Sequence, residues 1–130
     1  MLLNDAVALA KKNAVDVVLA VVGLDERSES EGLDRSTMAI PQAQNDLVTA
    51  LAKTGKPVVI VLVAGSPVEL PWFNDVAAML YVGLSGQPAR RHRARADRRS
   101  QPIGHLAETW PMQYEDCPAP AGIRPSDRDA

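Results

Sequence analysis

The sequence predicts an α/β protein, a three-layer sandwich built on a mostly parallel sheet. Helical and strand patterns alternate along residues 1–87, and each strand pattern is an unbroken apolar run. Strands that are apolar on both faces are typical of parallel sheets covered by helices on each side. With 130 residues, 46% of them hydrophobic, the chain is long enough for one compact domain with a buried core.

The first half of the pattern contains a helix, a strand and a second helix. Apolar residues at helical spacing predict a first helix over residues 2–10. Six consecutive apolar residues over 17–22, ending at Gly23, predict a strand buried on both faces. Pro41 then opens a second helix, whose predicted apolar stripe consists of Ala43, Leu47, Ala50 and Leu51.

The second half repeats the alternation. Gly55 ends the second helix, and the apolar run 58–64 predicts a second buried strand. A Gly-Ser-Pro turn follows at 65–67, and a short irregular or helical piece begins at 71–72. Residues 77–82 predict a third strand, so that the order along the chain is helix, strand, helix, strand, short helix, strand.

Three loops leave the carboxyl ends of these strands, where ligands bind in open parallel sheets. They are residues 23–40, 65–70 and 83–87. The first contains many acidic residues, and crowded carboxylates can raise one another's pKa into the range of a general acid. The alternative is a solvated loop rich in turn and helix-capping residues, and spacing alone does not decide between the two.

The remaining residues divide into three segments. Residues 88–101 are rich in arginine: positions 88–100 alone hold six arginines and one acid, a net charge of +5. Residues 102–119 form a short mixed segment, and residues 120–130 read as a polar tail. We expect 88–101 and 120–130 to be disordered, because neither can supply much of a core.

Composition argues against several classes of site. The single cysteine, Cys117, excludes an internal disulfide framework and a cysteine-rich zinc site. His92 and His105 lack neighbouring ligands at metal-binding spacing, so we expect no metal and no cofactor. Ser66 lies in a Gly-Ser-Pro turn instead of a nucleophile elbow, and the glycine-rich phosphate fingerprints are absent around it. We expect packing roles for Trp72 and Trp110, although each could stack on a sugar ring.

Nucleic-acid and membrane partners are also not expected. The formal net charge is −2, and the arginine run lacks the interleaved aromatic residues of a nucleic-acid surface. The longest apolar runs have six or seven residues, far below the roughly 20 that span a bilayer. No secretory leader pattern opens the sequence, so we expect a cytoplasmic protein.

Four ordered segments carry a resemblance to a known family. They are the stretch from Gly23 to Arg35 (GLDERSESEGLDR), continued by Met38–Pro41 and Gln44; residues 61–72 (VLVAGSPVELPW); Gly86-Gln87; and residues 104–111 (GHLAETWP). Together they resemble the C-terminal α/β-sandwich lobe of glycoside hydrolase family 3, of the β-glucosidase type. The resemblance implies a flavodoxin-like lobe, here incomplete and present as a truncated fragment.

The resemblance also implies site residues. In the family's Glu-Gly-x-Asp-Arg pattern the glutamate is the acid/base of a retaining hydrolysis, which points to Glu31, with Glu29 as the second candidate. Asp34 and Arg35 match the same motif and would brace the loop. The nucleophilic aspartate belongs to a TIM-barrel lobe, which this chain lacks. Retaining hydrolysis needs the two carboxyl groups about 5–5.5 Å apart.

The sequence departs from the family pattern after Gln87. An arginine-rich stretch stands where the family has a glycine-rich helix start, and the family pattern resumes at His105. A change of reading frame between residues 88 and 103, later restored, is our hypothesis for this departure. We therefore expect a lobe that acts on β-linked glucosides in carbohydrate metabolism only when joined to a barrel. The alternative is a non-enzymatic flavodoxin-like module that binds a small ligand.

Overall fold

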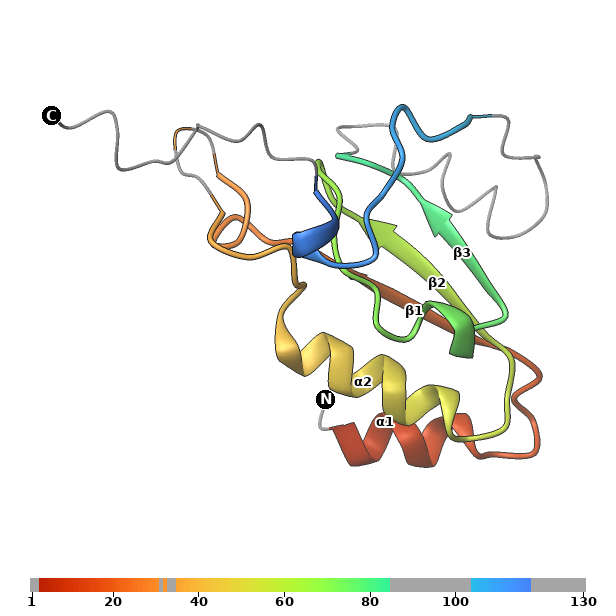
Figure 1. Cartoon of the computed structure of the whole chain (residues 1–130). Coiled ribbons are helices and arrows are strands. Elements are labelled where there is room, and N and C mark those ends of the chain that lie inside the picture. Colours follow the sequence, from red (N-terminus) through yellow and green to blue (C-terminus); the bar gives the residue numbers. More distant parts are fainter. Residues whose placement is uncertain (1–2, 31, 33–34, 85–103, 118–130) are drawn as a thin grey trace, which may run out of the picture.

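The predicted strands form one parallel sheet. The computed structural model describes residues 3–30, 32, 35–84 and 104–117. Its elements are α1 (Leu3–Ala10), β1 (Val18–Gly23), α2 (Gln42–Ala52), β2 (Val58–Val63), the 3₁₀ turn η1 (Phe73–Asp75), β3 (Ala78–Tyr81) and the 3₁₀ turn η2 (Tyr114–Asp116). The strands lie in the order β1-β2-β3, and both pairings are parallel (Figure 1). The α/β class and the parallel sheet are thus confirmed, with strand ends within one residue of the predicted ones.

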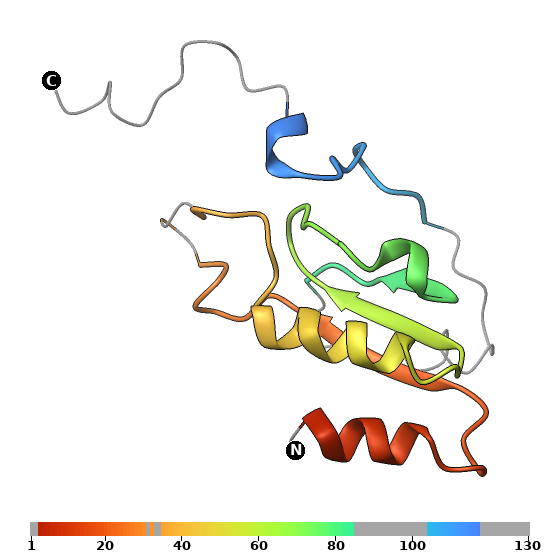
Figure 2. The same cartoon turned by 60° about the horizontal axis from the view of Figure 1, so that its bottom comes forward.

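Both helices pack on the same face of this sheet. Figure 1 shows α1 and α2 side by side below the strands, and in the turned view of Figure 2 α2 lies in front of them. The described residues therefore contain one of the two helical layers that the sequence predicts. The 3₁₀ turn η1 and residues 104–117 lie on the same face as the helices. Residues 104–117 cross in front of β2 and β3 (Figure 1).

The buried stripe of α2 differs from the predicted one. Asn45, Val48 and Leu51 are buried, whereas Ala43 is exposed. The polar Asn45 can be buried because its Oδ1 accepts a hydrogen bond of 2.8 Å from the indole Nε1 of the buried Trp72. A satisfied polar group is compatible with a core position. The prediction is confirmed for Leu51 and for Leu47, which packs against the core, and is wrong for the exposed Ala43.

A single hydrophobic core lies between the sheet and these elements. Trp72, as expected, serves packing and is 1% exposed, and Trp110 packs edge-on against Tyr81 with ring centroids 5.0 Å apart. The buried apolar residues are Ala10, Ala20, Val22, Ile40, Val48, Leu51, Val58, Ile60, Leu62, Ala64, Val68 and Trp72. All the inward positions of β2 belong to this set, so the middle strand organises the core.

The opposite face of β1 is open within the described residues. Leu19 is 52% exposed and Val21 is 67% exposed, although the apolar run predicted burial on both faces. That prediction is wrong for β1 in the part of the chain that the structure describes, because successive side chains alternate between faces and helices cover only one of them. β1 thus has more apolar side-chain surface than the described residues around it bury.

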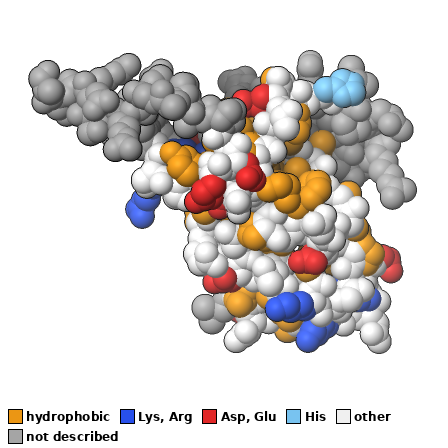
Figure 3. Space-filling model, in the orientation of Figure 1, with side chains coloured by type: hydrophobic (Ala, Val, Ile, Leu, Met, Phe, Trp, Pro, Cys, Tyr) orange, Lys and Arg blue, Asp and Glu red, His pale blue; other side chains and the backbone are white. Residues whose placement is uncertain are grey.

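Residues 104–117 are attached to the loops that follow β1 and β2 through a few specific contacts. The Tyr114 N–H donates to Glu69 Oε1 at 2.9 Å, and Cys117 Sγ lies 3.4 Å from Met38 Sδ. Figure 3 shows hydrophobic side chains gathered where this segment crosses the sheet, and a groove of about 390 Å³ there is lined by residues such as Phe73 and Met112. The segments 88–101 and 120–130, with their predicted disorder, lie outside the described residues.

The contact between Gly23 and β2 gives a first prediction. A Cβ atom on Gly23 would collide with the carbonyl oxygen of Val63. Gly23→Ala should therefore lower the free energy of unfolding by about 2–3 kcal/mol, measured by urea denaturation. The control is Gly55→Ala, where φ is +80° but nothing lies within 4 Å, and which should cost about 1 kcal/mol. Equal losses at the two positions would contradict the predicted collision.

The open face of β1 gives a second prediction. Replacing Leu19 and Val21 together by threonine keeps β propensity but removes exposed apolar surface. The double variant should stay monomeric at concentrations where the parent chain associates, as measured by light scattering after gel filtration. The control Val58→Thr, at a position 1% exposed, should instead lower stability.

Candidate functional site

The carboxyl ends of β1 and β2 lie level, because Gly23 pairs with Val63. The loop that follows β1 and the Gly65–Pro67 turn that follows β2 therefore emerge side by side (Figure 1). Residues 104–117 complete the group from a third direction. This is the edge at which the sequence predicted a ligand crevice.

The start of the first loop is fixed by Gln44 on α2. The Gly23 N–H donates to Gln44 Oε1 at 2.7 Å, and Gln44 Nε2 donates to the Gly23 carbonyl oxygen at 3.0 Å. The side-chain amide thus pairs with both backbone groups of Gly23, as a neighbouring strand would. This pairing sets the position from which the acidic loop leaves the sheet.

Asp25 organises the next turn of the loop. Its Oδ1 accepts hydrogen bonds from the N–H groups of Arg27 and Ser28, at 3.2 and 3.0 Å, and from the Ser28 hydroxyl at 2.9 Å. The hydrogen bonds from the Ser28 side chain and backbone lower the pKa of Asp25 below its ordinary value. Asp25 is therefore a turn-capping carboxylate, as the solvated-loop interpretation expects, and is poorly suited to act as a general acid.

Glu29 reaches across to the turn after β2. Its Oε2 accepts a hydrogen bond of 2.9 Å from the Gly65 N–H, and its Oε1 accepts one of 2.8 Å from the Ser66 hydroxyl. Each carboxylate oxygen thus already has a donor from the turn. This geometry favours an anchoring role for Glu29, because an acid/base must turn an oxygen toward the leaving group.

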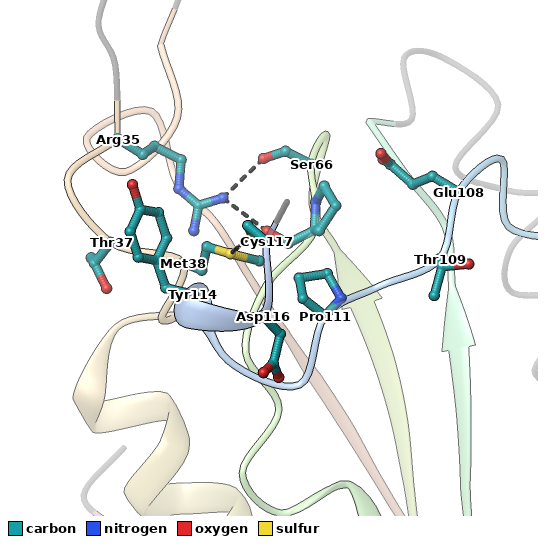
Figure 4. Close-up of a pocket in the computed structure, with 11 residues that line it drawn as sticks. Arg35, Thr37, Met38, Ser66, Glu108, Thr109, Pro111, Tyr114, Asp116 and Cys117 are labelled. Carbon is teal, nitrogen blue, oxygen red and sulfur yellow. Dashed lines mark hydrogen bonds between the residues drawn. The ribbon is translucent and has the colours of Figure 1, made fainter. Parts of the chain in front are cut away.

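Arg35 reaches the same turn from the other side of the loop. Its Nη1 donates to Ser66 Oγ at 2.9 Å and to the Pro67 carbonyl oxygen at 3.2 Å (Figure 4). Its Nη2 is buried and has no hydrogen-bond partner among the residues that the structure describes. Arg35 is thus attached to Ser66 and Pro67. The predicted brace between Asp34 and Arg35 stays a prediction, because Asp34, like Glu31, lies outside the described residues.

Arg35 also separates two cavities. One, of about 620 Å³, lies between Arg35, Ser66, Tyr114 and Cys117 (Figure 4). The other, of about 510 Å³, is lined by hydroxyl groups and Arg27 near the start of α2. In the part of the chain that the structure describes, no three His, Cys, Asp or Glu side chains are placed to hold a metal ion. No helix among those residues is long and apolar enough to cross a membrane.

Tyr81 and Glu108 are site residues that sequence reasoning missed. The Tyr81 hydroxyl donates to the Ala64 carbonyl oxygen at 2.8 Å, directly before the turn. Burial raises the pKa of Tyr81, and the negative charges of Glu29 and Glu108 raise it further. Both carboxylates thus lie near the ends of β2 and β3. The sequence signal that could have identified Tyr81 is its position near the end of the third apolar run, residues 77–82.

The fold and this edge define an α/β lobe with an acidic loop clamped at the carboxyl ends of its strands. The model of the glycosyl hydrolase family 3 C-terminal domain matches residues 3–129, so the chain belongs to this family. Over 121 residues it is 41% identical to thermostable beta-glucosidase B of Acetivibrio thermocellus, covering 91% of this chain and 16% of that protein.

Solved structures agree with this assignment. The family 3 β-glucosidase of Bifidobacterium adolescentis matches with a TM-score of 0.83 and 39% identity, over 92% of this chain and 18% of that one. The β-glucosidase of Kluyveromyces marxianus in complex with glucose matches with a TM-score of 0.81 and 33% identity, over 88% of this chain and 14% of that one. The chain thus spans less than a fifth of each of these relatives.

Tyr81 gives a third prediction, on pH dependence. Because its folded-state pKa is raised above 10.0, the folded state keeps a proton that the unfolded state loses, and stability should fall as the pH rises through 10 and above. Tyr81→Phe should lose about 1 kcal/mol at pH 7, through the missing hydrogen bond, and show a shallower fall above pH 10. Urea denaturation between pH 7 and 11 measures both effects. An unchanged alkaline slope would contradict the assignment.

Proposed function

We propose that this chain is the acid/base-bearing lobe of a retaining β-glycosidase, with Glu31 as the acid/base. The proposal extends the family assignment to a role for one residue and to β-glucoside-like substrates. It is supported by the relatives, which are β-glucosidases by name, and by the glucose bound in the Kluyveromyces marxianus structure. Because the chain spans 14–18% of these relatives, the activity would belong to a larger assembly.

The proposed chemistry needs two carboxyl groups, and each of two lobes would supply one of them. Glu31 would protonate the leaving glycosidic oxygen and then activate the water that hydrolyses the glycosyl intermediate. The nucleophilic carboxylate would come from a TIM-barrel lobe, and the substrate would be a β-linked sugar held between the lobes. No metal or cofactor takes part in this scheme.

The observation that carries the proposal is the attachment of the loop on both sides of Glu31. Glu29 and Arg35 are hydrogen-bonded to the same turn at the carboxyl edge of the sheet. Between them Gly32 has φ +78°, a backbone conformation that glycine adopts readily. Apart from its chain neighbours, no atom of the described residues lies within 4 Å of the place its Cβ would occupy. This open space is compatible with the approach of a ligand to the backbone beside Glu31.

The test is a chimera in which residues of this chain replace the matching 121 residues of the Acetivibrio thermocellus relative. Glu31→Ala in this chimera should lower kcat/KM on glucosides with poor leaving groups by about 10²–10⁴-fold. The glycosylation step of activated aryl glucosides should lose much less, because a good leaving group needs no proton. Azide should restore turnover and yield a β-glucosyl azide.

Two controls accompany this variant. Glu29→Ala should not be restored by azide, because its carboxylate anchors the loop and does not activate water. The isolated 130-residue chain should show no hydrolysis, since it lacks the nucleophile lobe. Rescue of Glu29→Ala instead of Glu31→Ala would move the acid/base by two residues. A folded chimera that binds glucose but does not hydrolyse glucosides would favour the non-enzymatic module.

A further inference from the structure

We infer that Ser66 is a positioning residue for the proposed acid/base: its hydroxyl holds together the two ends of the loop segment that contains Glu31. The inference rests on the proposed function for its catalytic consequence. The contacts themselves lie entirely within described residues.

The hydroxyl of Ser66 is the meeting point of two oppositely charged side chains. It donates to Glu29 Oε1 at 2.8 Å and accepts from Arg35 Nη1 at 2.9 Å. Glu29 and Arg35 are six positions apart in the sequence, whereas Ser66 lies more than 30 positions from either. The two ends of the segment from Glu29 to Arg35 are therefore both hydrogen-bonded to one atom of another loop, Ser66 Oγ.

Neighbouring backbone groups complete this clamp, which we define as Glu29, Arg35 and the turn Gly65–Pro67. The Gly65 N–H donates to the second oxygen of Glu29, and the Pro67 carbonyl accepts from Arg35. A Cβ atom on Gly65 would stand 2.8 Å from Glu29 Oε1. Glycine at 65 thus leaves the room that Glu29 needs to reach Ser66.

The Ser66 hydroxyl is suited to this bridging role because one atom both donates and accepts. Glu29 offers acceptors alone and Arg35 offers donors alone, so the group between them must donate to one and accept from the other. Both bonds involve a charged partner, which makes them stronger than neutral hydrogen bonds. Alanine at 66 removes the bridge, while threonine retains it, and the side chain borders a cavity with space for the added methyl group.

The catalytic consequence follows from distance. General acid/base transfer requires the carboxyl group within about 2.6–3.2 Å of the oxygen it protonates, so small displacements of the loop are costly. The effect of Ser66 on the proposed acid/base would be exerted through its hydrogen bonds to Glu29 and Arg35. Its loss should therefore reduce kcat more than it changes KM.

The first experiment is limited trypsin digestion of the full 130-residue chain, followed by mass spectrometry. Trypsin must accept the side chain of Arg35, which the clamp holds, whereas Arg27 is exposed. Ser66→Ala should increase cleavage after Arg35 about tenfold relative to cleavage after Arg27, because the open form becomes more populated. Ser66→Thr should restore the ratio of the parent chain.

Two comparisons separate this effect from general unfolding. Cleavage after Lys53, at the end of α2, should be unchanged in Ser66→Ala. The matched control Ser28→Ala removes a hydroxyl that bonds Asp25 in the same loop but outside the clamp, so it should not accelerate cleavage after Arg35. The inference is overturned if Ser66→Ala leaves the Arg35 to Arg27 ratio unchanged, or accelerates Lys53 cleavage equally.

The second experiment measures the catalytic consequence in the chimera. Ser66→Ala should lower kcat by at least tenfold with KM nearly unchanged, Ser66→Thr should restore kcat, and azide should not rescue Ser66→Ala. Full activity of Ser66→Ala, or rescue of it by azide, overturns the positioning role. The two proposals fail in different ways. A Glu31→Ala chimera with undiminished kcat contradicts the acid/base assignment. The trypsin result tests the clamp alone and does not depend on which residue is the acid/base.

Discussion

The parallel pairing of β1 with β2 is the constraint on which the rest of this structure depends. Gly23 faces Val63 at the end of the pair so closely that no side chain fits at Gly23. The two strands therefore end at the same level, and the loops that follow them start side by side. Without this register, Glu29 and Arg35 could not reach a turn that lies more than 30 residues further along the chain.

Within the described part of the chain, helices cover one face of the sheet only. The inward residues of β2 are fully buried, while the outward residues Leu19 and Val21 of β1 remain exposed. Apolar strands of this kind are stable when layers cover both of their faces. A chain that spans 14–18% of its relatives therefore carries, in the sequence of β1, surface suited to parts of the family's larger proteins.

Sequence reasoning recovered the features that depend on local patterns. Apolar runs located all three strands, and Pro41 marked the start of α2. It failed where a distant partner decides. The burial of Asn45 depends on the indole of Trp72, 27 positions away, and Arg35 donates a hydrogen bond to Ser66, 31 positions away. Neither pairing leaves a trace in spacing or composition.

The same limit applies to the two glutamates of the acidic loop. Glu29 and Glu31 lie two positions apart in the same loop, and only Glu31 directly precedes a glycine, Gly32. The structure distinguishes Glu29, because the Gly65 N–H and the Ser66 hydroxyl each bond to one of its oxygens. A carboxylate that fastens the loop and a carboxylate that reacts have opposite requirements: the first needs donors fixed around it, and the second needs an oxygen open to the substrate. Under the proposed scheme, the loop can remain attached to the turn through Glu29 and Arg35 while Glu31 exchanges protons, since the attachment does not use the proposed reactive group.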